Sequence, residues 1–268
     1  MNTSLFTYEF PPELVAQHPL PERDHAKMMV VHRKTQSWEH QHFYNLPDYL
    51  KPGDLLILND AEADLVSYEG KQVPALPPYI KRKQIDDFSK EDYERYRTIY
   101  AKTPGSKAAP TAGFHFTQEL LQKLQTEGVE IQTLTLHVSF DTFKPIRSEK
   151  IQDHPMHGEN YFLPPATEEA ICKAKEESRR IIAVGTTTVR ALESWALSPT
   201  KNQTSLFITP GFQFQIVDAL ITNFHRPRST VLVMVATFAG HELIGAAYQE
   251  AIQKKYRLFS YGDCLLII

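Results

Sequence analysis

RRIIAVGTTTVRALESW, residues 179–195, is the stretch that decides the fold class of this chain. Its residues 181–184 form a short apolar run, which is typical of a strand buried on both faces. Gly185 interrupts the run, and three threonines follow where a helix would begin. A strand, a glycine-led turn and a helix start direct several free backbone N–H groups at one spot, where a carboxylate or a phosphate can bind. The same pattern also fits an ordinary strand-to-helix turn of an α/β protein.

The rest of the chain alternates in the same way. Apolar or alternating runs predict strands at residues 28–32, 38–43, 55–58, 96–101, 129–138, 206–208 and 219–221, and two strand pieces within 256–268. Helical spacing and capping residues predict helices at residues 117–128, 167–175, 230–239 and 241–254. This alternation predicts the α/β class.

Residues 61–90 lack this regularity. Three prolines interrupt the segment, and its apolar residues keep no clear period. We therefore expect a connection between two portions of the fold, longer than most loops. The predicted division is 1–60 and 91–268 for the two parts of one main domain, with 61–90 as the linker.

The overall composition indicates an ordinary globular protein. The chain has 268 residues, 42% of them hydrophobic and 23% charged, and a formal net charge of −3. Nothing global indicates nucleic-acid binding, although a local basic patch remains compatible with it. The two cysteines show no metal or redox spacing, and no signal sequence or membrane-length apolar run is present. We expect a cytoplasmic protein without a membrane span.

Polar side chains collect where the predicted strands end. A good strand delivers His137 at its carboxyl end, and the sequence TNFHRPRS places four more at a strand-to-helix junction, namely Asn223, His225, Arg226 and Arg228. The segment HPMHGEN holds His154, His157 and Glu159. This spacing resembles a metal site, but Pro155 lies inside it and no helix supports it, so we predict no metal. Acid–base residues or ligand hydrogen bonds fit as well.

Basic residues begin within the predicted linker, with Lys81 and Arg82, and continue beyond it to Lys107. Acidic residues lie among them, so a solvated charged face is as good an explanation as a phosphate-binding patch.

Several blocks of the sequence, in order, resemble one known family. They are TIYAKTPGSKAAPTAGFHFT, TLHV, DTFKPI, HPMHGENY, IIAVGTTTVRALES, VDALITNFHRPRST and YRLFSYGDCLLI, with FTYEFPPELVAQHP, the pair Arg23-Asp24 and LKPGDLLILND before them. These blocks are similar to the motifs of the S-adenosylmethionine:tRNA ribosyltransferase-isomerase family. The resemblance covers most of residues 6–60 and nearly everything from residue 76 onward.

The resemblance implies a reaction in queuosine biosynthesis. Family members transfer and isomerise the ribosyl part of S-adenosylmethionine onto 7-aminomethyl-7-deazaguanine in the tRNA anticodon, giving epoxyqueuosine-tRNA, adenine and methionine. S-adenosylmethionine is consumed, so no recycled cofactor is implied. The expected partners are the tRNA anticodon stem-loop and S-adenosylmethionine, and the expected state is a monomer. The family fold is a barrel-like α/β main domain with a small inserted β-barrel.

Two departures from the family pattern matter. Residues 61–74 stand in place of the inserted β-barrel, and fourteen residues are too few to build one. Ser139 and Asp141 occupy positions that are glycines in the family, and their side chains would narrow a pocket. Two hypotheses follow, a working enzyme and a catalytically impaired paralogue that binds S-adenosylmethionine, a nucleoside or RNA.

The resemblance suggests roles for individual residues. A base must remove a proton from the sugar carbon beside the sulfonium, and the departing adenine needs a proton donor; the catalytic candidates are His137, His157, Glu159, His225 and Asp263. The candidates for substrate binding are Gly113, His115, Gly185, Thr186, Thr187, Arg190 and Asn223. In this group, the helix start with Arg190 suits the methionyl carboxylate, and the small residues at 108–114 suit a flat base. The candidates for RNA binding are Lys81, Arg82, Lys144, Arg226 and Arg228.

Overall fold

The strand at residues 181–184 lies at the centre of a nine-stranded sheet. The structure is a computed structural model that describes the backbone of residues 1–268 and every side chain except those of Ile85 and Asp141. The strand order in the sheet is β11-β9-β8-β3-β10-β12-β13-β1-β2. These strands are β1 (Lys27–His32), β2 (Ser37–His42), β3 (Leu55–Asn59), β8 (Glu130–Leu136), β9 (Glu159–Phe162), β10 (Ile181–Val184), β11 (Gln203–Thr204), β12 (Ala219–Asn223) and β13 (Cys264–Ile267).

The four central strands run parallel to one another. β3 pairs in parallel with both β8 and β10, and β10 pairs in parallel with β12. Their carboxyl ends therefore lie along one edge of the sheet, where ligands of open α/β sheets usually bind. β13 is antiparallel to β12, with Asn223 opposite Cys264. The loop that precedes β13 consequently reaches the same edge.

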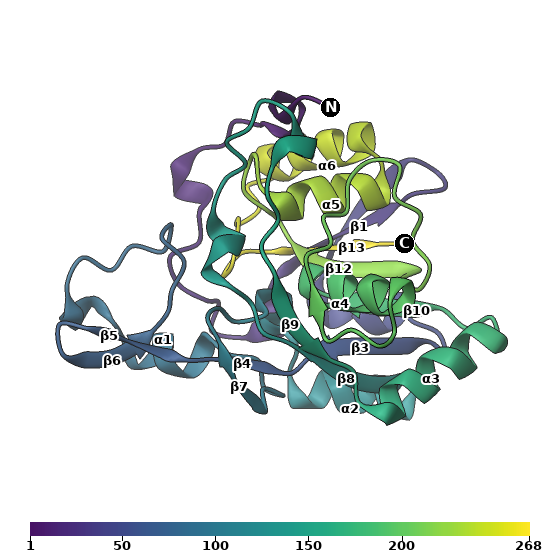
Figure 1. The fold of residues 1–268 in the computed structure, drawn as a ribbon. Coiled ribbons are helices and arrows are strands. Elements are labelled where there is room, and N and C mark those ends of the chain that lie inside the picture. The colour runs from purple at the N-terminus through teal and green to yellow at the C-terminus, as the bar shows by residue number, and fades with distance from the viewer.

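Helices cover both faces of the sheet (Figure 1). One face carries Leu55, Ile57, Ile181 and Ala183, and it packs against four helices, which are α3 (Pro165–Glu176), α4 (Thr186–Leu197), α5 (Thr230–Ala239) and α6 (His241–Gln253). The other face packs against α2 (Gln118–Thr126) and the short 3-10 helices at residues 43–49 and 111–115. The α/β class is thus confirmed. The sheet has two edge strands, β11 and β2, so it is an open sheet and not a closed barrel.

The strands predicted at residues 96–101 and 206–208 are wrong. Tyr96 follows the short helix α1 (Lys90–Arg95), whose first turn is capped by Ser89. Leu206 lies just after β11, and its backbone N–H bonds to the Thr204 hydroxyl. Tyr96 and Ile208 are buried all the same. Their apolar patterns correctly indicated burial. A buried apolar segment does not always pair as a strand, however, and the sequence alone does not distinguish the two cases.

Residues 61–90 have more structure than a plain connection. β4 (Ala61–Ala63) pairs with β7 (Thr103–Ser106), and β5 (Leu65–Tyr68) forms a hairpin with β6 (Lys71–Pro74). The hairpin turn contains Glu69 and Gly70, both at positive φ, as a tight two-residue turn requires. The hairpin and α1 project together to the left of the main sheet (Figure 1). The division into 1–60, 61–90 and 91–268 remains a prediction.

None of the helices described is, taken singly, long and apolar enough to cross a membrane; α5 and α6 meet that test only as a pair, with a bend of 113° between them.

Candidate active site

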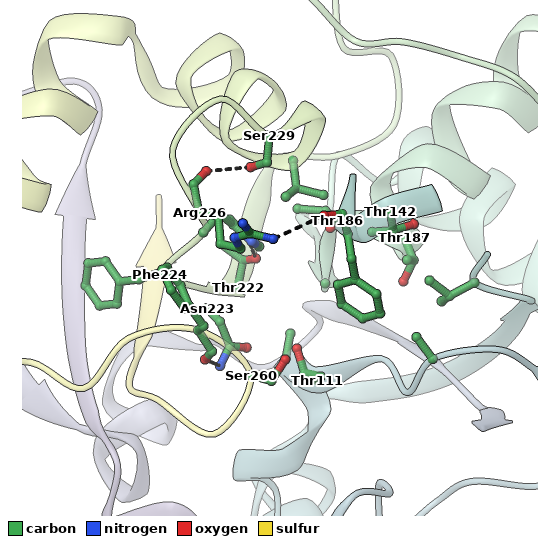
Figure 2. Close-up of a pocket in the computed structure, with 18 of the residues that line it drawn as sticks. Thr111, Thr142, Thr186, Thr187, Thr222, Asn223, Phe224, Arg226, Ser229 and Ser260 are labelled. Carbon is green, nitrogen blue, oxygen red and sulfur yellow. Dashed lines mark hydrogen bonds between the residues drawn. The ribbon is translucent and has the colours of Figure 1, made fainter. Parts of the chain in front are cut away.

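A pocket opens at the carboxyl edge of the parallel strands, and Figure 2 shows its polar lining. The segments that follow β8, β10 and β12 meet there, together with the small-residue loop at 108–112 and the loop before β13. Gly185, Thr186, Thr187 and Asn223 line the pocket, as four of the predicted substrate-binding residues. His225, Lys144 and Arg226 also line it, although the sequence suggested catalysis for the first and RNA binding for the other two.

The start of α4 forms one wall of the pocket. Gly185 is the N-terminal cap residue, and its φ is +92°. An L residue with a side chain would be strained in this conformation. No side chain caps this helix start, so N–H groups of its first turn are available to a ligand. Asn59, at the end of β3, donates to Thr187 Oγ1 (3.1 Å) and to the Leu136 carbonyl (3.0 Å). Asn59 thereby holds the helix start against β8.

Arg190 is already engaged in a buried ion pair. Its guanidinium pairs with Glu159, and the two residues are only 4% and 3% exposed. Its remaining donors reach the carbonyls of Leu206 (3.2 Å) and His157 (3.4 Å). Arg190 borders a smaller hollow next to the pocket. Because its donors are occupied, a substrate carboxylate would have to displace Glu159 to bind it.

Glu159 collects further donors besides Arg190. It accepts from the Ser139 backbone N–H (2.7 Å), the Thr142 hydroxyl (3.2 Å) and His157 Nε2 (3.3 Å). Burial opposes its ionisation, but the hydrogen bond from His157 and the charge of Arg190 outweigh burial and hold the pKa of Glu159 below its usual range. A carboxylate so stabilised is a poor proton acceptor at neutral pH.

Asn223, at the end of β12, is 2% exposed. Its Nδ2 lies 3.1 Å from the Phe259 carbonyl and 3.4 Å from Nε2 of His115. His115 itself stands behind the pocket wall, in a neighbouring hollow with Phe114 and Tyr261. Burial lowers the pKa of His115 to about 4, with the bond to Asn223 partly opposing that shift.

His225 lies two residues after Asn223 and lines the pocket directly. Its Nε2 is 2.8 Å from the Thr222 hydroxyl, and its backbone N–H donates to the Tyr248 hydroxyl (2.9 Å). Burial lowers the pKa of His225 to about 3, so the imidazole is neutral at neutral pH.

Acidification is expected to destabilise the fold through these two imidazoles. Their folded pKa values of about 4 and about 3 lie below the ordinary value of 6.5. The unfolded chain therefore binds more protons, and stability falls as the pH drops below about 6.5. At pH 4 the His115 share of this loss is about 3 kcal/mol. Urea unfolding of wild type and His115→Gln at pH 7 and pH 4 measures it, and the variant should lose less on acidification. Equal losses in the two proteins would contradict this assignment.

The pocket also carries positive charge. The Arg226 guanidinium lies 5.6 Å from the centre of the Tyr79 ring and donates to the Phe143 carbonyl (3.1 Å). Figure 2 shows Arg226 between Ser229 and Thr222, facing Thr186. Lys144 lines the pocket and is exposed. Lys81 and Arg228 are exposed too, but they lie outside the pocket lining.

Several predicted site residues lie outside the pocket and have structural contacts. Asp263 is 1% exposed, and it accepts from the backbone N–H groups of Lys27 (2.9 Å) and Arg257 (2.7 Å). Arg82 makes a two-pronged ion pair with Asp92 at 2.9 and 2.7 Å, and its side chain is 5% exposed. These contacts engage both side chains within the protein, and the roles suggested for Asp263 and Arg82 remain predictions.

Three further residues are also set back from the pocket. His137 packs against Gly105, and its buried Nδ1 has no hydrogen-bond partner among the described atoms. His157 contacts Glu159 without reaching the pocket lining. Gly113 is buried where a Cβ would collide with Tyr100 and Thr98, so its small size serves packing. The side chain of Asp141 lies outside the described part, and the narrowing of the pocket expected from it stays a prediction.

The sequence reasoning missed Tyr79 and Ser260. Their hydroxyls are 2.7 Å apart, and both residues line the pocket. Burial raises the pKa of Tyr79 to about 12. Tyr79 lies in the irregular proline-rich segment, where the apolar residues have no regular spacing that would single it out. Asn59 was missed as a positioning residue, although its place at a strand end was a usable signal.

His154, His157 and Glu159 do not converge on an ion site. His154 packs edge-on against Phe207, while the other two bond to each other. Among the described side chains, the group that comes close enough together for an ion is Glu22, Asp24 and His25 on the surface. Nothing else at that surface group points to a ligand.

The motifs that meet at the pocket also identify related proteins. A family model described as queuosine biosynthesis protein matches residues 3–73 and 64–267. The chain is 38% identical to the S-adenosylmethionine:tRNA ribosyltransferase-isomerase of Thermotoga maritima and 41% identical to that of Carboxydothermus hydrogenoformans, and each alignment covers 100% of both chains. A crystal structure of S-adenosylmethionine tRNA ribosyltransferase from Thermotoga maritima is similar with a TM-score of 0.71 and 36% identity, over 99% of this chain and 100% of that one.

The same comparisons bear on the missing insert. The alignment with the Thermotoga maritima relative extends over 343 positions, whereas this chain has 268 residues, so about 75 positions of that alignment have no residue here. The two parts of the family match meet at residues 64–73. The β5–β6 hairpin, Leu65 to Pro74, occupies this place.

Proposed function

The chain belongs to the queuosine biosynthesis family of S-adenosylmethionine:tRNA ribosyltransferase-isomerases, and we propose that the pocket at the carboxyl edge of its sheet is the active site for that reaction. The chain is accordingly an enzyme with S-adenosylmethionine and tRNA as substrates. The observation that carries the assignment of the pocket is the meeting of the helix start at Gly185, the small-residue loop at 108–112 and the polar end of β12 around one cavity.

The methionyl carboxylate of S-adenosylmethionine binds at the start of α4. Free backbone N–H groups and the positive end of the helix dipole favour an anion there. Thr186 and Thr187 border both the pocket and the adjoining hollow. Arg190 contributes to this site only indirectly, because the ion pair with Glu159 already neutralises the charge of its guanidinium.

The purine and the deazaguanine share the remaining space. Residues 108–112 offer small side chains on one side, and the ring of Phe259 lines the same cavity. Flat bases stack on such surfaces. Arg226 and Lys144 stand close enough to the cavity to meet a phosphate of the extruded anticodon nucleotide.

His225 is the best-supported proton acceptor of the five catalytic candidates, because it is the one that lines the pocket. Burial keeps its imidazole neutral, which leaves a ring nitrogen able to accept a proton. The adjacent sulfonium acidifies the sugar carbon, and the base that removes its proton must lie in hydrogen-bond reach of that carbon. The assignment of His225 rests on its position in the pocket lining, because its lowered pKa makes it a weak base. The surroundings of His137, His157, Glu159 and Asp263 give less support to a catalytic role.

RNA binding is proposed for the surface around the pocket mouth. Lys144 and Arg226 are its inner cations, and the exposed Lys81 and Arg228 extend it. The anticodon stem-loop of tRNA is the proposed partner, bound by one copy of the chain in the cytoplasm. The paralogue without catalytic activity is not favoured, since the relatives that match over the whole chain carry the enzyme's name.

The decisive experiment incubates the protein with S-adenosylmethionine and tRNA that carries 7-aminomethyl-7-deazaguanine, and measures adenine release and the modified nucleoside. Both products are expected in equal amounts. The variant His225→Gln is expected to lower kcat by about 10²- to 10⁴-fold. His25→Gln, whose side chain is 55% exposed, serves as the matched control with unchanged turnover. A folded wild-type protein that forms neither product, beside an active relative, would contradict the proposal.

A further inference from the structure

We propose that the side-chain oxygen of Asn223 recognises an amino group of the substrate, and that His115 holds the Asn223 amide in the orientation this requires. The inference rests on the proposed function, because that function supplies the ligands. It adds which side-chain atom of the protein recognises one of these ligands. Asn223 would thus determine specificity, and His115 would be a positioning residue behind it.

The orientation of the Asn223 amide follows from its neighbours. One of its two terminal atoms lies 3.1 Å from the Phe259 carbonyl oxygen. A carbonyl oxygen only accepts hydrogen bonds, so the atom facing it must be the NH₂ group. The same nitrogen lies 3.4 Å from Nε2 of His115. Both protons of the amide are therefore engaged by these two acceptors.

The Asn223 oxygen is left without a partner. It is buried, and among the described atoms it accepts no hydrogen bond. The residue as a whole is 98% buried, at 2% exposure, and it lines the pocket. Figure 2 shows Asn223 on the lower side of the pocket, beside Ser260 and Thr111. A buried acceptor without a donor is costly, and native proteins rarely tolerate one without a purpose. A ligand N–H group would satisfy it.

His115 makes this orientation the favoured one. Its imidazole is neutral at neutral pH because burial lowers its pKa to about 4. The neutral ring can keep its Nε2 lone pair toward the Asn223 NH₂ group, with the proton on Nδ1. A flipped amide would place the Asn223 oxygen against both this lone pair and the Phe259 carbonyl. The flip would cost two hydrogen bonds and create two repulsions.

Two substrate groups offer the required N–H donor. One is the 6-amino group of the adenosyl moiety, and the other is the amine of the aminomethyl group on the 7-deazaguanine. Both are primary amines on or beside a flat ring, which the small residues at 108–112 can accommodate. The experiment therefore has one arm for each source.

The first arm measures binding by calorimetry, without turnover. The probes are S-adenosylhomocysteine and S-inosylhomocysteine, in which an oxygen replaces the 6-amino group. If Asn223 reads the adenosyl group, the wild-type protein should bind the first probe about 10- to 100-fold more tightly. The second arm compares RNA hairpins with 7-aminomethyl- and 7-methyl-7-deazaguanine, and the same preference is expected there if the deazaguanine is the donor.

Variants assign the preference to Asn223. Asn223→Leu should bring the affected probe pair to within about 3-fold of each other. Asn202→Leu, at an exposed position, is the matched control and should retain the preference. His115→Phe should lower the preference, and His115→Gln, which keeps an acceptor, should restore it; a merely structural role would not produce this difference.

The wild-type measurements test the inference even where a variant fails to fold. Binding of both probe pairs without any preference in the wild-type protein would overturn the inference while leaving the proposed function intact. A preference that persists in folded Asn223→Leu would also overturn it. Failure of S-adenosylhomocysteine to bind at all would count against the proposed function itself, and against this inference with it.

Discussion

Replacement of Arg190 by Met is expected to lower the free energy of unfolding by about 3–5 kcal/mol at pH 7.5. The pair with Glu159 is buried on both sides, at 4% and 3% exposure. Met fills a similar volume but leaves the carboxylate charged in a site without its cation. Urea unfolding followed by circular dichroism measures the loss.

The pH dependence separates this cause from simple misfit. Without Arg190, protonation of Glu159 removes the unpaired charge, so the deficit relative to wild type should shrink between pH 7.5 and pH 5. Lys90→Met is the control, because its pair with Glu94 is exposed (88% and 59%) and should contribute less than about 1 kcal/mol. A deficit of Arg190→Met that is equally small, or independent of pH, would contradict the account.

Gly262→Ala is expected to destabilise the protein by about 3 kcal/mol and to abolish most activity. A Cβ at this position would lie 2.5 Å from the Arg257 carbonyl oxygen and from the carbonyl carbon of Leu258. Both are backbone atoms, which cannot rotate away as a side chain can. The loop concerned also presents Ser260 to the pocket, so its displacement should reach the substrate. Thermal unfolding and adenine release together measure the two effects.

Gly245→Ala is the matched control for this substitution. Gly245 lies within α6, and a Cβ there would meet nothing within 4 Å. The same chemical change should therefore stabilise the protein by about 0.5–1 kcal/mol through helix propensity. Equal effects of the two substitutions would contradict this prediction.

The sequence predicted those parts of the fold that depend on neighbouring residues. The apolar run at 181–184 and the following glycine and threonines became the central strand β10 and the start of α4. The cap at Thr117 and the apolar helix at 230–239 are confirmed as well. Each depends on a short-range pattern, either burial on both faces or the capping of a helix.

The contacts between distant segments were beyond that reasoning. Arg190 and Glu159 were assigned to a substrate carboxylate and to catalysis, yet they neutralise each other across 31 positions. His115 and Asn223 lie 108 positions apart and meet behind the pocket wall. Asp263 carries a carboxyl group at a glycine turn, which suggested an acid, but its oxygens bind backbone N–H groups. Residue type indicates available chemistry, whereas the fold decides whether a ligand or another side chain uses it.

A crystal structure of the protein with bound S-adenosylhomocysteine tests the central claim most directly. The account predicts the amino-acid carboxylate at the start of α4, beside Thr186, and an adenine that lies against residues 108–112 within the same pocket. Density for the ligand elsewhere, for example in the hollow beside Arg23 and Arg95, with an empty pocket at the carboxyl edge of the sheet, would contradict it.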